Sequence, residues 1–266
     1  MTLDPQPARS GGASGFPMAP SQQEWDAMSE AERERVLAEL PLAITDAEMS
    51  PPEGDEHYEA KNEVRETLRA WFARRGERVY VAAELTVYYP AEPRFAPDVL
   101  AVRDVEVRNR TRWVVSAEGK GLDWVMEVHC GGDRKKDAET NVIRYARLGI
   151  REYFIYDRAR QRVHGYRLPA PGARAYEPIV PQQGRYPSAV LDLELAVEDG
   201  RLRFYHANAQ LLTAREWVEK LGELVAQVSA ERDAEAERAR QEAERAAAAE
   251  AQLERLRAEL EALRKR

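Results

Sequence analysis

LDWVMEVHCGGDRKKDAETNVIRYARLGIREYFIYD, residues 122–157, is the stretch that decides the fold class. Its first run, residues 122–129, and its last run, residues 151–157, are rich in β-branched and aromatic residues, which is typical of strands. Residues 134–148 between them place apolar side chains at helical spacing and end before Gly149, a common helix stop. A helix between two strands permits a parallel crossover. The stretch therefore predicts an α/β sheet.

The flanking segments extend this sheet in both directions. Residues 57–75 predict an amphipathic helix that stops at Gly76, and the segments after it favour strands. Short turns between several of the strands favour antiparallel pairing. We expect a mixed α/β sheet flanked by helices, with strands at 78–89, 95–102, 122–129, 151–157 and 162–168 and shorter ones within 176–181 and 189–206.

The N-terminal region differs from this core. Residues 1–20 are rich in Pro, Gly, Ala and Ser and show no hydrophobic periodicity, so we expect a disordered N-terminus. Ser21 followed by Glu24 has the spacing of a capping box. It predicts one N-terminal helix over residues 21–41, which Pro41 ends.

The C-terminal segment, residues 213–266, predicts a coiled-coil helix. Its apolar residues step by threes and fours, with one short step near Ala246, and charged residues fill the other faces. The seam consists of Ala236, Ala239, Ala243, Ala246, Ala249, Leu253, Leu256, Leu260 and Leu263. We expect a homo-oligomer formed through this helix; the alternative is a single solvated helix.

Composition limits the compartment and the partners. The chain has 266 residues, 44% hydrophobic, and a single cysteine, Cys130, so no internal disulfide forms and a reducing compartment is favoured. No apolar run approaches the length of a membrane span, which favours a cytoplasmic protein without a membrane partner. The net charge of −7 does not exclude DNA, because acidic residues outnumber basic ones mainly within residues 1–50.

Two carboxylates carry the chemical hypothesis. Asp98 follows Pro97 at the start of the second expected strand, and Glu127 lies within the third. Buried carboxylates are costly unless they are paired or bind a metal. Two of them at one end of adjacent strands are suited to Mg²⁺, which can activate a water and offset phosphate charge. The plainer interpretations are a turn residue for Asp98 and a solvent-facing strand residue for Glu127.

Three segments resemble a known family. PDVLAV (97–102), MEVH (126–129) and KKDAETNVIRYARLGIREYFIYD (135–157) are similar to the Uma-two family of restriction endonucleases, within the PD-(D/E)xK nuclease superfamily. MSPP (49–52) followed by His57 also resembles the family's entry segment. The resemblance covers about residues 45–170 and implies a restriction-endonuclease-like domain, which we place at 42–212.

The resemblance implies a metal site and a substrate. Asp98, Glu127 and the backbone carbonyl of Val128 would bind Mg²⁺ or Mn²⁺, and DNA would be the substrate. The family's lysine is missing from both of its usual positions, where this chain has His129 and Asn141.

Several nearby residues are candidates for the missing charge or for accessory roles. We favour Lys136 as the catalytic lysine because it opens the helix, with Lys135 and Lys120 as alternatives. The further accessory candidates are His57, His129 and Glu63. The plainer interpretations are a hydrogen-bonded residue near a helix start for His57 and a solvated helix face for Glu63.

Three functional hypotheses follow. The first is a metal-dependent endonuclease that hydrolyses DNA phosphodiester bonds by in-line attack of an activated water. The second, motivated by the missing lysines, is a catalytically degenerate nuclease fold used as a DNA-binding or coiled-coil assembly module. The third is a coiled-coil interaction protein whose globular part is a passenger.

Overall fold

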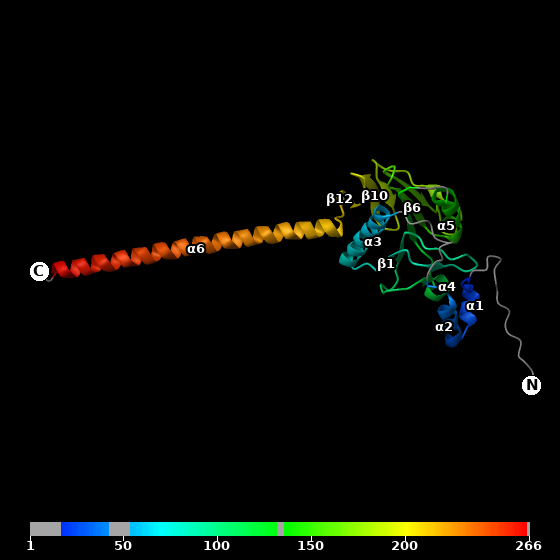
Figure 1. Ribbon diagram of the computed structural model, residues 1–266, viewed down its shortest axis with the longest axis horizontal. Helices are drawn as coiled ribbons and strands as arrows, with labels where there is room; N and C mark the ends of the chain where they lie inside the picture. Colours follow the sequence, from blue (N-terminus) through cyan, green and yellow to red (C-terminus); the bar gives the residue numbers. More distant parts are fainter. Residues whose placement is uncertain (1–16, 43–53, 132–135, 265–266) are drawn as a thin grey trace, which may run out of the picture. The chain divides into compact units, whose positions relative to one another are not determined.

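The computed structural model describes residues 17–42, 54–131 and 136–264. The chain divides into two compact units, Met1–Thr213 and Ala214–Arg266. Figure 1 labels their helices and strands.

A six-stranded sheet forms the centre of the first unit. Its order is β1-β3-β5-β6-β7-β8. β5 and β6 run parallel, with Val128 opposite Tyr156, and the other neighbours are antiparallel. The predicted mixed α/β sheet is confirmed. Its strands are β1 (Val79–Ala83), β3 (Val99–Arg103), β5 (Trp124–His129), β6 (Glu152–Asp157), β7 (Arg162–Arg167) and β8 (Glu177–Pro178).

The crossover from β5 to β6 follows the decisive stretch of sequence. It consists of a short π-helix, η1 (Lys136–Asn141), and α5 (Val142–Leu148). Gly149 ends α5 with φ 79, a conformation that glycine adopts without a Cβ clash. The expected single helix is thus two segments within the described residues. π-helical turns of this kind are often found at functional sites.

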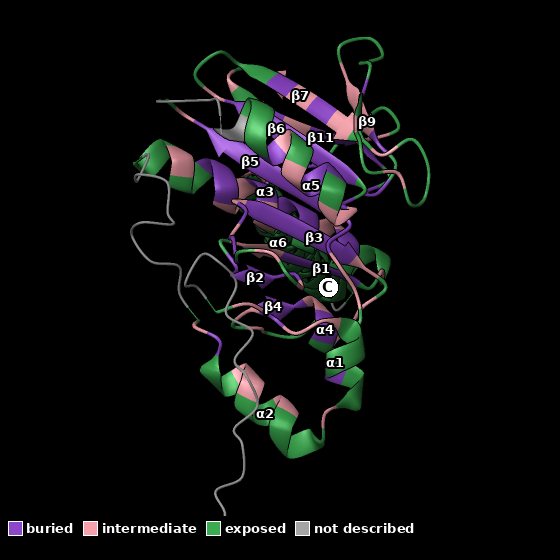
Figure 2. Cartoon of the chain, turned by 90° about the vertical axis from the view of Figure 1, so that its right-hand side faces the viewer, coloured by how far each residue is buried: buried purple, intermediate pink, exposed green. Residues whose placement is uncertain are grey.

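Helices cover both faces of the sheet. α3 (Asp55–Arg75) packs against β1, β3 and β5, and α5 packs on the opposite face. Figure 2 shows α5 in front of the buried strands and α3 behind them. α3 forms because its buried residues recur at helical spacing, and Gly76 ends it in the left-handed conformation.

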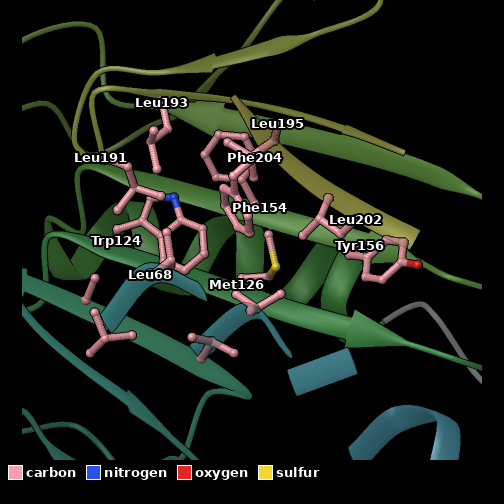
Figure 3. Close-up of a cluster of buried hydrophobic side chains, with 14 of the residues drawn as sticks. Leu68, Trp124, Met126, Phe154, Tyr156, Leu191, Leu193, Leu195, Leu202 and Phe204 are labelled. Carbon is pink, nitrogen blue, oxygen red and sulfur yellow. The ribbon is translucent and has the colours of Figure 1, made fainter. Parts of the chain in front are cut away.

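A second sheet packs on the α3 side. Its order is β12-β11-β10-β9, and all its pairs are antiparallel. Figure 3 shows its leucines and Phe204 meeting Trp124, Met126 and Phe154 of the main sheet. Burial of these large side chains fastens the two sheets together. The strands are β9 (Tyr186–Ser188), β10 (Leu193–Glu198), β11 (Arg201–His206) and β12 (Ala209–Gln210).

The expected strand over residues 78–89 is interrupted. β1 ends at Ala83, and Glu84 has φ 52, the left-handed region. The chain then leaves the main sheet, and β2 (Val87–Tyr88) pairs in parallel with β4 (Trp113–Val114), which precedes α4 (Val115–Glu118). The prediction of one continuous strand was therefore wrong, because a residue in the left-handed conformation interrupts the pleat.

The N-terminal region also differs from expectation. Residues 1–16, where disorder was predicted, lie outside the described residues, but Ala19 is buried and bridges to Pro90. The single helix over 21–41 is two helices, α1 (Gln22–Ala27) and α2 (Glu30–Glu39). Ser29 is the cause, because it starts α2 with a second capping box.

The second unit is one long helix, α6 (Ala214–Arg264), with no buried residue. The helical prediction for this segment is confirmed, while pairing with another helix stays a prediction. Within residues 17–42, 54–131 and 136–264, no helix combines the length and apolarity needed to cross a membrane.

Candidate active site

Asp98 and Glu127 lie at the same end of neighbouring strands and stabilise each other's position. Val99 pairs with Met126, so Asp98, just before β3, comes next to Glu127 on β5. The Asp98 backbone N–H donates to Glu127 Oε2 over 3.2 Å. The Val128 backbone N–H donates to Asp98 Oδ2 over 2.8 Å. Each carboxylate thus accepts a hydrogen bond from the other's strand, which orients both side chains.

Helix α5 orients Glu127 from the opposite side. The hydroxyl of Tyr145 donates to Glu127 Oε1 over 2.6 Å. Both residues are buried, with Glu127 8% and Tyr145 2% exposed. The site therefore has an ordered inner wall, built from a strand and the helix that follows it.

Helix α3 brings two nitrogen-bearing side chains to Asp98. His57 Nε2 lies 3.1 Å from Asp98 Oδ2, within hydrogen-bond distance. Lys61 Nζ lies 3.7 Å from Asp98 Oδ1. His57 and Lys61 are four residues apart, one helical turn, so they share a face of α3. Each oxygen of Asp98 thus faces a different group of this helix.

Glu84 is a third acid at this end of the sheet. It follows β1, where Ala83 pairs with Val99, so it lies next to Asp98. Its backbone N–H donates to the carbonyls of Pro97 and Asp98 over 3.1 and 3.3 Å. Its carboxylate accepts a hydrogen bond from Lys61 Nζ and is 58% exposed. The carboxylates of Glu84 and Asp98 therefore both lie beside the ammonium of Lys61, and Glu127 lies next to Asp98 on the neighbouring strand.

The remaining predicted residues of β5 and η1 lie close to this end of the sheet. Val128 contributes its N–H. His129 is buried and lies opposite Asp157 on β6. Asn141 is the last residue of η1 and is buried. Lys136 opens η1, but its side chain lies outside the described part of the chain, as does all of Lys135.

Two predicted candidates are placed elsewhere. Glu63 lies on α3 with its Oε1 3.8 Å from Arg201 Nη1, on the side facing β11. Lys120 Nζ donates to the Arg103 carbonyl over 2.6 Å and lies 3.1 Å from Asp123 Oδ2. Because Arg103 is at the other end of β3 from Asp98, Lys120 is at the wrong end of the sheet to serve the site.

Sequence reasoning missed Lys61, Glu84 and Tyr145 as site residues. A signal existed for Lys61, since it continues the apolar stripe of Val64, Leu68 and Phe72 toward His57. A charged residue on a buried stripe is unusual enough to mark a candidate. For Glu84 no such signal existed, because its position depends on the break after β1.

Glu152, within the segment that resembles the family, has a structural role. Its carboxylate accepts hydrogen bonds from the Ser188 hydroxyl and from the N–H groups of Ala189 and Val190. Burial raises its pKa above the ordinary value, although these hydrogen bonds lower it. Glu152 thus ties β6 to the loop before β10.

The donors at this end of the sheet fit a hard divalent cation. Asp98 and Glu127 offer oxygen ligands, which Mg²⁺ prefers, and Mg²⁺ usually keeps several waters. Among the residues that the structure describes, no three His, Cys, Asp or Glu side chains are grouped to hold a metal ion by themselves. A site of two carboxylates, a backbone carbonyl and waters does not require such a group.

The fold and the site define a class, a mixed α/β domain whose sheet carries paired carboxylates at its strand ends. The family model described as "Uma2: Putative restriction endonuclease" matches residues 44–198. The chain belongs to this family, and the resemblance stated from its motifs is confirmed.

Comparison with individual proteins identifies a similar solved structure. No curated protein matches the chain. Among solved structures, it is similar to a crystal structure titled as a putative nuclease belonging to DUF820 from Anabaena variabilis. The two are 15% identical with a TM-score of 0.45, over 57% of this chain and 83% of the other.

Proposed function

We propose that this protein is a metal-dependent endonuclease that hydrolyses DNA phosphodiester bonds. The observation that carries the proposal is the reciprocal hydrogen bonding of Asp98 and Glu127, which holds two carboxylates at one end of β3 and β5. Membership of a restriction endonuclease family supports DNA as the substrate.

In this proposal Asp98, Glu127 and the Val128 carbonyl would hold Mg²⁺ or Mn²⁺. The chemistry that such an ion supplies when bound is Lewis-acid activation of water and compensation of phosphate charge. The protein contributes preorganisation: Tyr145 and the Asp98 N–H hold Glu127, and the Val128 N–H holds Asp98. Groups fixed before the reaction need no reorganisation during it.

The test is nicking of supercoiled plasmid DNA with Mg²⁺ or Mn²⁺. Asp98→Asn and Glu127→Gln keep the shape of each side chain but remove its charge. We expect each to slow cleavage by about 100-fold or more, the scale for removing one electrostatic contributor. Glu63→Ala is the matched control, because Glu63 pairs with Arg201 instead. Full activity in both site variants would contradict the proposal.

The second candidate function is a DNA-binding or assembly module without catalysis. His129 and Asn141 at the family's two lysine positions favour it. Calorimetry distinguishes the two candidates. The module predicts salt-sensitive DNA binding with no Mg²⁺ or Mn²⁺ binding, whereas the endonuclease predicts metal binding that Asp98→Asn weakens.

We propose further that α6 joins two copies of this chain. Its apolar residues Val218, Leu221, Val225, Val228, Leu253, Leu256, Leu260 and Leu263 are all more than half exposed. Within each of the two groups, residues 218–228 and residues 253–263, they recur at three- and four-residue steps, the pattern that a second helix covers in a coiled coil. The single cysteine favours a reducing compartment, so we place the protein in the cytoplasm.

A further inference from the structure

Lys61 is a charged residue at a buried position of α3 whose neighbours along the same helix face are apolar. It lies on the buried stripe of α3 with Val64, Leu68 and Phe72, and it is only 4% exposed. A buried ammonium loses hydration, and this cost is offset only by close partners. Methionine would fill the same space without that cost. The burial of a charge here therefore points to a role for the charge.

The partners of Lys61 are the acids of the candidate active site. Its Nζ donates to Glu84 Oε1 and lies 3.7 Å from Asp98 Oδ1. A separation of 3.7 Å is an ion pair but is too long for a hydrogen bond. The other oxygen of Asp98 accepts from the Val128 N–H and lies near His57. Lys61 therefore lies beside Asp98 Oδ1, whereas the backbone N–H of Val128 binds Asp98 Oδ2.

The backbone conformation of Glu84 supports this arrangement. Glu84 is in the left-handed region with φ 52, which is uncommon for a residue with a Cβ. The backbone N–H of Glu84 donates hydrogen bonds to the carbonyls of Pro97 and Asp98. The conformation of Glu84 and the position of Asp98 are therefore coupled. Strained residues of this kind concentrate at functional sites. The left-handed turn at Glu84 therefore places the carboxylate that binds Lys61 next to Asp98.

We infer that Lys61 supplies the ammonium of this active site, from α3, with Glu84 as its anchor. This inference rests on the proposed nuclease function and names the group that completes it. Neither β5 nor the following helix has a lysine at the family's positions, where His129 and Asn141 stand. A different element therefore brings the charge to Asp98.

The role of Lys61 in hydrolysis is electrostatic. A bond forms between the water oxygen and phosphorus while the bond from phosphorus to one ester oxygen breaks. The water loses a proton to solvent, and the leaving oxygen gains one. Lys61 keeps its proton throughout, orients the attacking water and offsets charge on the phosphoryl oxygens.

The experiment compares Lys61→Met, Lys61→Arg and Lys136→Met in the full chain. Plasmid nicking, Mn²⁺ binding by calorimetry and thermal unfolding are measured for each. We expect Lys61→Met to cut about 100-fold more slowly, the scale for one lost electrostatic contributor, while it still binds Mn²⁺. Lys61→Arg keeps a positive charge and should retain at least about a tenth of the activity. Lys136→Met tests the lysine that the sequence favoured, and it should lose less activity than Lys61→Met.

Three outcomes would overturn the assignment of Lys61 while leaving the nuclease proposal intact. One is full activity of Lys61→Met. Another is an equal loss in Lys61→Met and Lys61→Arg, which would indicate packing. The third is a loss in Lys136→Met alone.

Two further outcomes would contradict both the role of Lys61 and the nuclease proposal. If Mn²⁺ bound only after Lys61→Met, the ammonium would be a replacement for a metal ion, and both proposals would fail. A wild type that neither cuts DNA nor binds Mn²⁺, with Asp98→Asn unchanged from it, would also overturn both.

Discussion

At the scale of single residues, two buried glutamates on neighbouring strands have different roles. Glu152 accepts three hydrogen bonds from residues 188–190, so it joins one part of the fold to another. Glu127 accepts from Tyr145 and from the Asp98 N–H at the end of the sheet, beside a second carboxylate. The surroundings of each carboxylate decide its role, although both occur in strand-like sequence.

Glu152→Gln tests the pKa of Glu152. Burial raises this pKa above its ordinary value of 4.5, so the folded state binds the proton more tightly than the unfolded state. The contribution of Glu152 to stability is then greatest at low pH and falls as pH rises through the raised pKa. Gln mimics the protonated acid. We expect it to be nearly neutral at about pH 4.5 and increasingly more stable than the wild type at higher pH.

Urea unfolding of both proteins across this pH range checks the prediction. Glu152→Ala is the comparison that removes the acceptor altogether. It should cost about 1–3 kcal/mol at low pH, because the N–H groups of Ala189 and Val190 lose their partner, and the cost should fall as pH rises. A Gln variant that became less stable than the wild type as pH rises would show that the hydrogen bonds outweigh burial.

At the scale of elements, α3 combines packing with chemistry. Leu68 and Phe72 fill the core between the two sheets, while His57 and Lys61 one or more turns earlier reach Asp98. One helix face thus changes from apolar to polar along its length. This change places the site where the helix leaves the core.

Gly165 on strand β7 has no room for a side chain. A Cβ on Gly165 would come within 2.8 Å of Phe154 Cε1 and 3.2 Å of an Ile179 methyl carbon. Both neighbours are buried, so they have little room to move. We expect Gly165→Ala to destabilise the fold by about 1–3 kcal/mol, the cost of overpacking.

Denaturant unfolding with Gly131→Ala as the control checks this prediction. A Cβ on Gly131 has no atom within 4 Å, so this variant should unfold like the wild type. Equal stability of Gly165→Ala and the wild type would mean that Phe154 can repack without cost.

At the scale of the whole molecule, the charges on α6 favour a parallel pair of helices. With the last four leucines at core positions a and d, Glu259 takes position g and Arg264 the next position e. Glu235 and Arg240 have the same relation around Ala236 and Ala239. In a parallel pair, g of one helix faces the next e of the other, so Glu faces Arg. An antiparallel pair would place like charges together.

We therefore expect the full chain to sediment as a dimer, and Glu259→Arg to weaken it by placing Arg beside Arg264 of the second copy. Each exposed pair contributes about 0.2–1 kcal/mol, and a dimer has two copies of the pair. The double change Glu259→Arg with Arg264→Glu should restore the wild-type dissociation constant. Glu261→Arg, on an outer position, is the control. A chain that stays monomeric, or a double variant that is not restored, would contradict parallel pairing.

Sequence patterns were sufficient to predict the class of fold and the long C-terminal helix, and they singled out the two central carboxylates. These features depend on local patterns: alternating strand residues on either side of a helix, a three–four repeat, and motif residues Asp98 and Glu127. Local periodicity survives folding because it is what the core selects. The strand ends, the split of 78–89 and the break at Ser29 were missed, because capping and a single left-handed residue shift boundaries.

Which other groups lie beside the carboxylates depends on how the helices and strands pack in three dimensions. Lys61 and Glu84 are 23 residues apart, and they meet because α3 packs against β1, the strand that Glu84 follows. Lys120 is closer to Glu127 in sequence than Lys61, yet it lies at the opposite end of the sheet. Sequence distance does not report which strand ends coincide, since antiparallel pairing reverses direction at each neighbour. The assembly of the site is therefore a property of the sheet order.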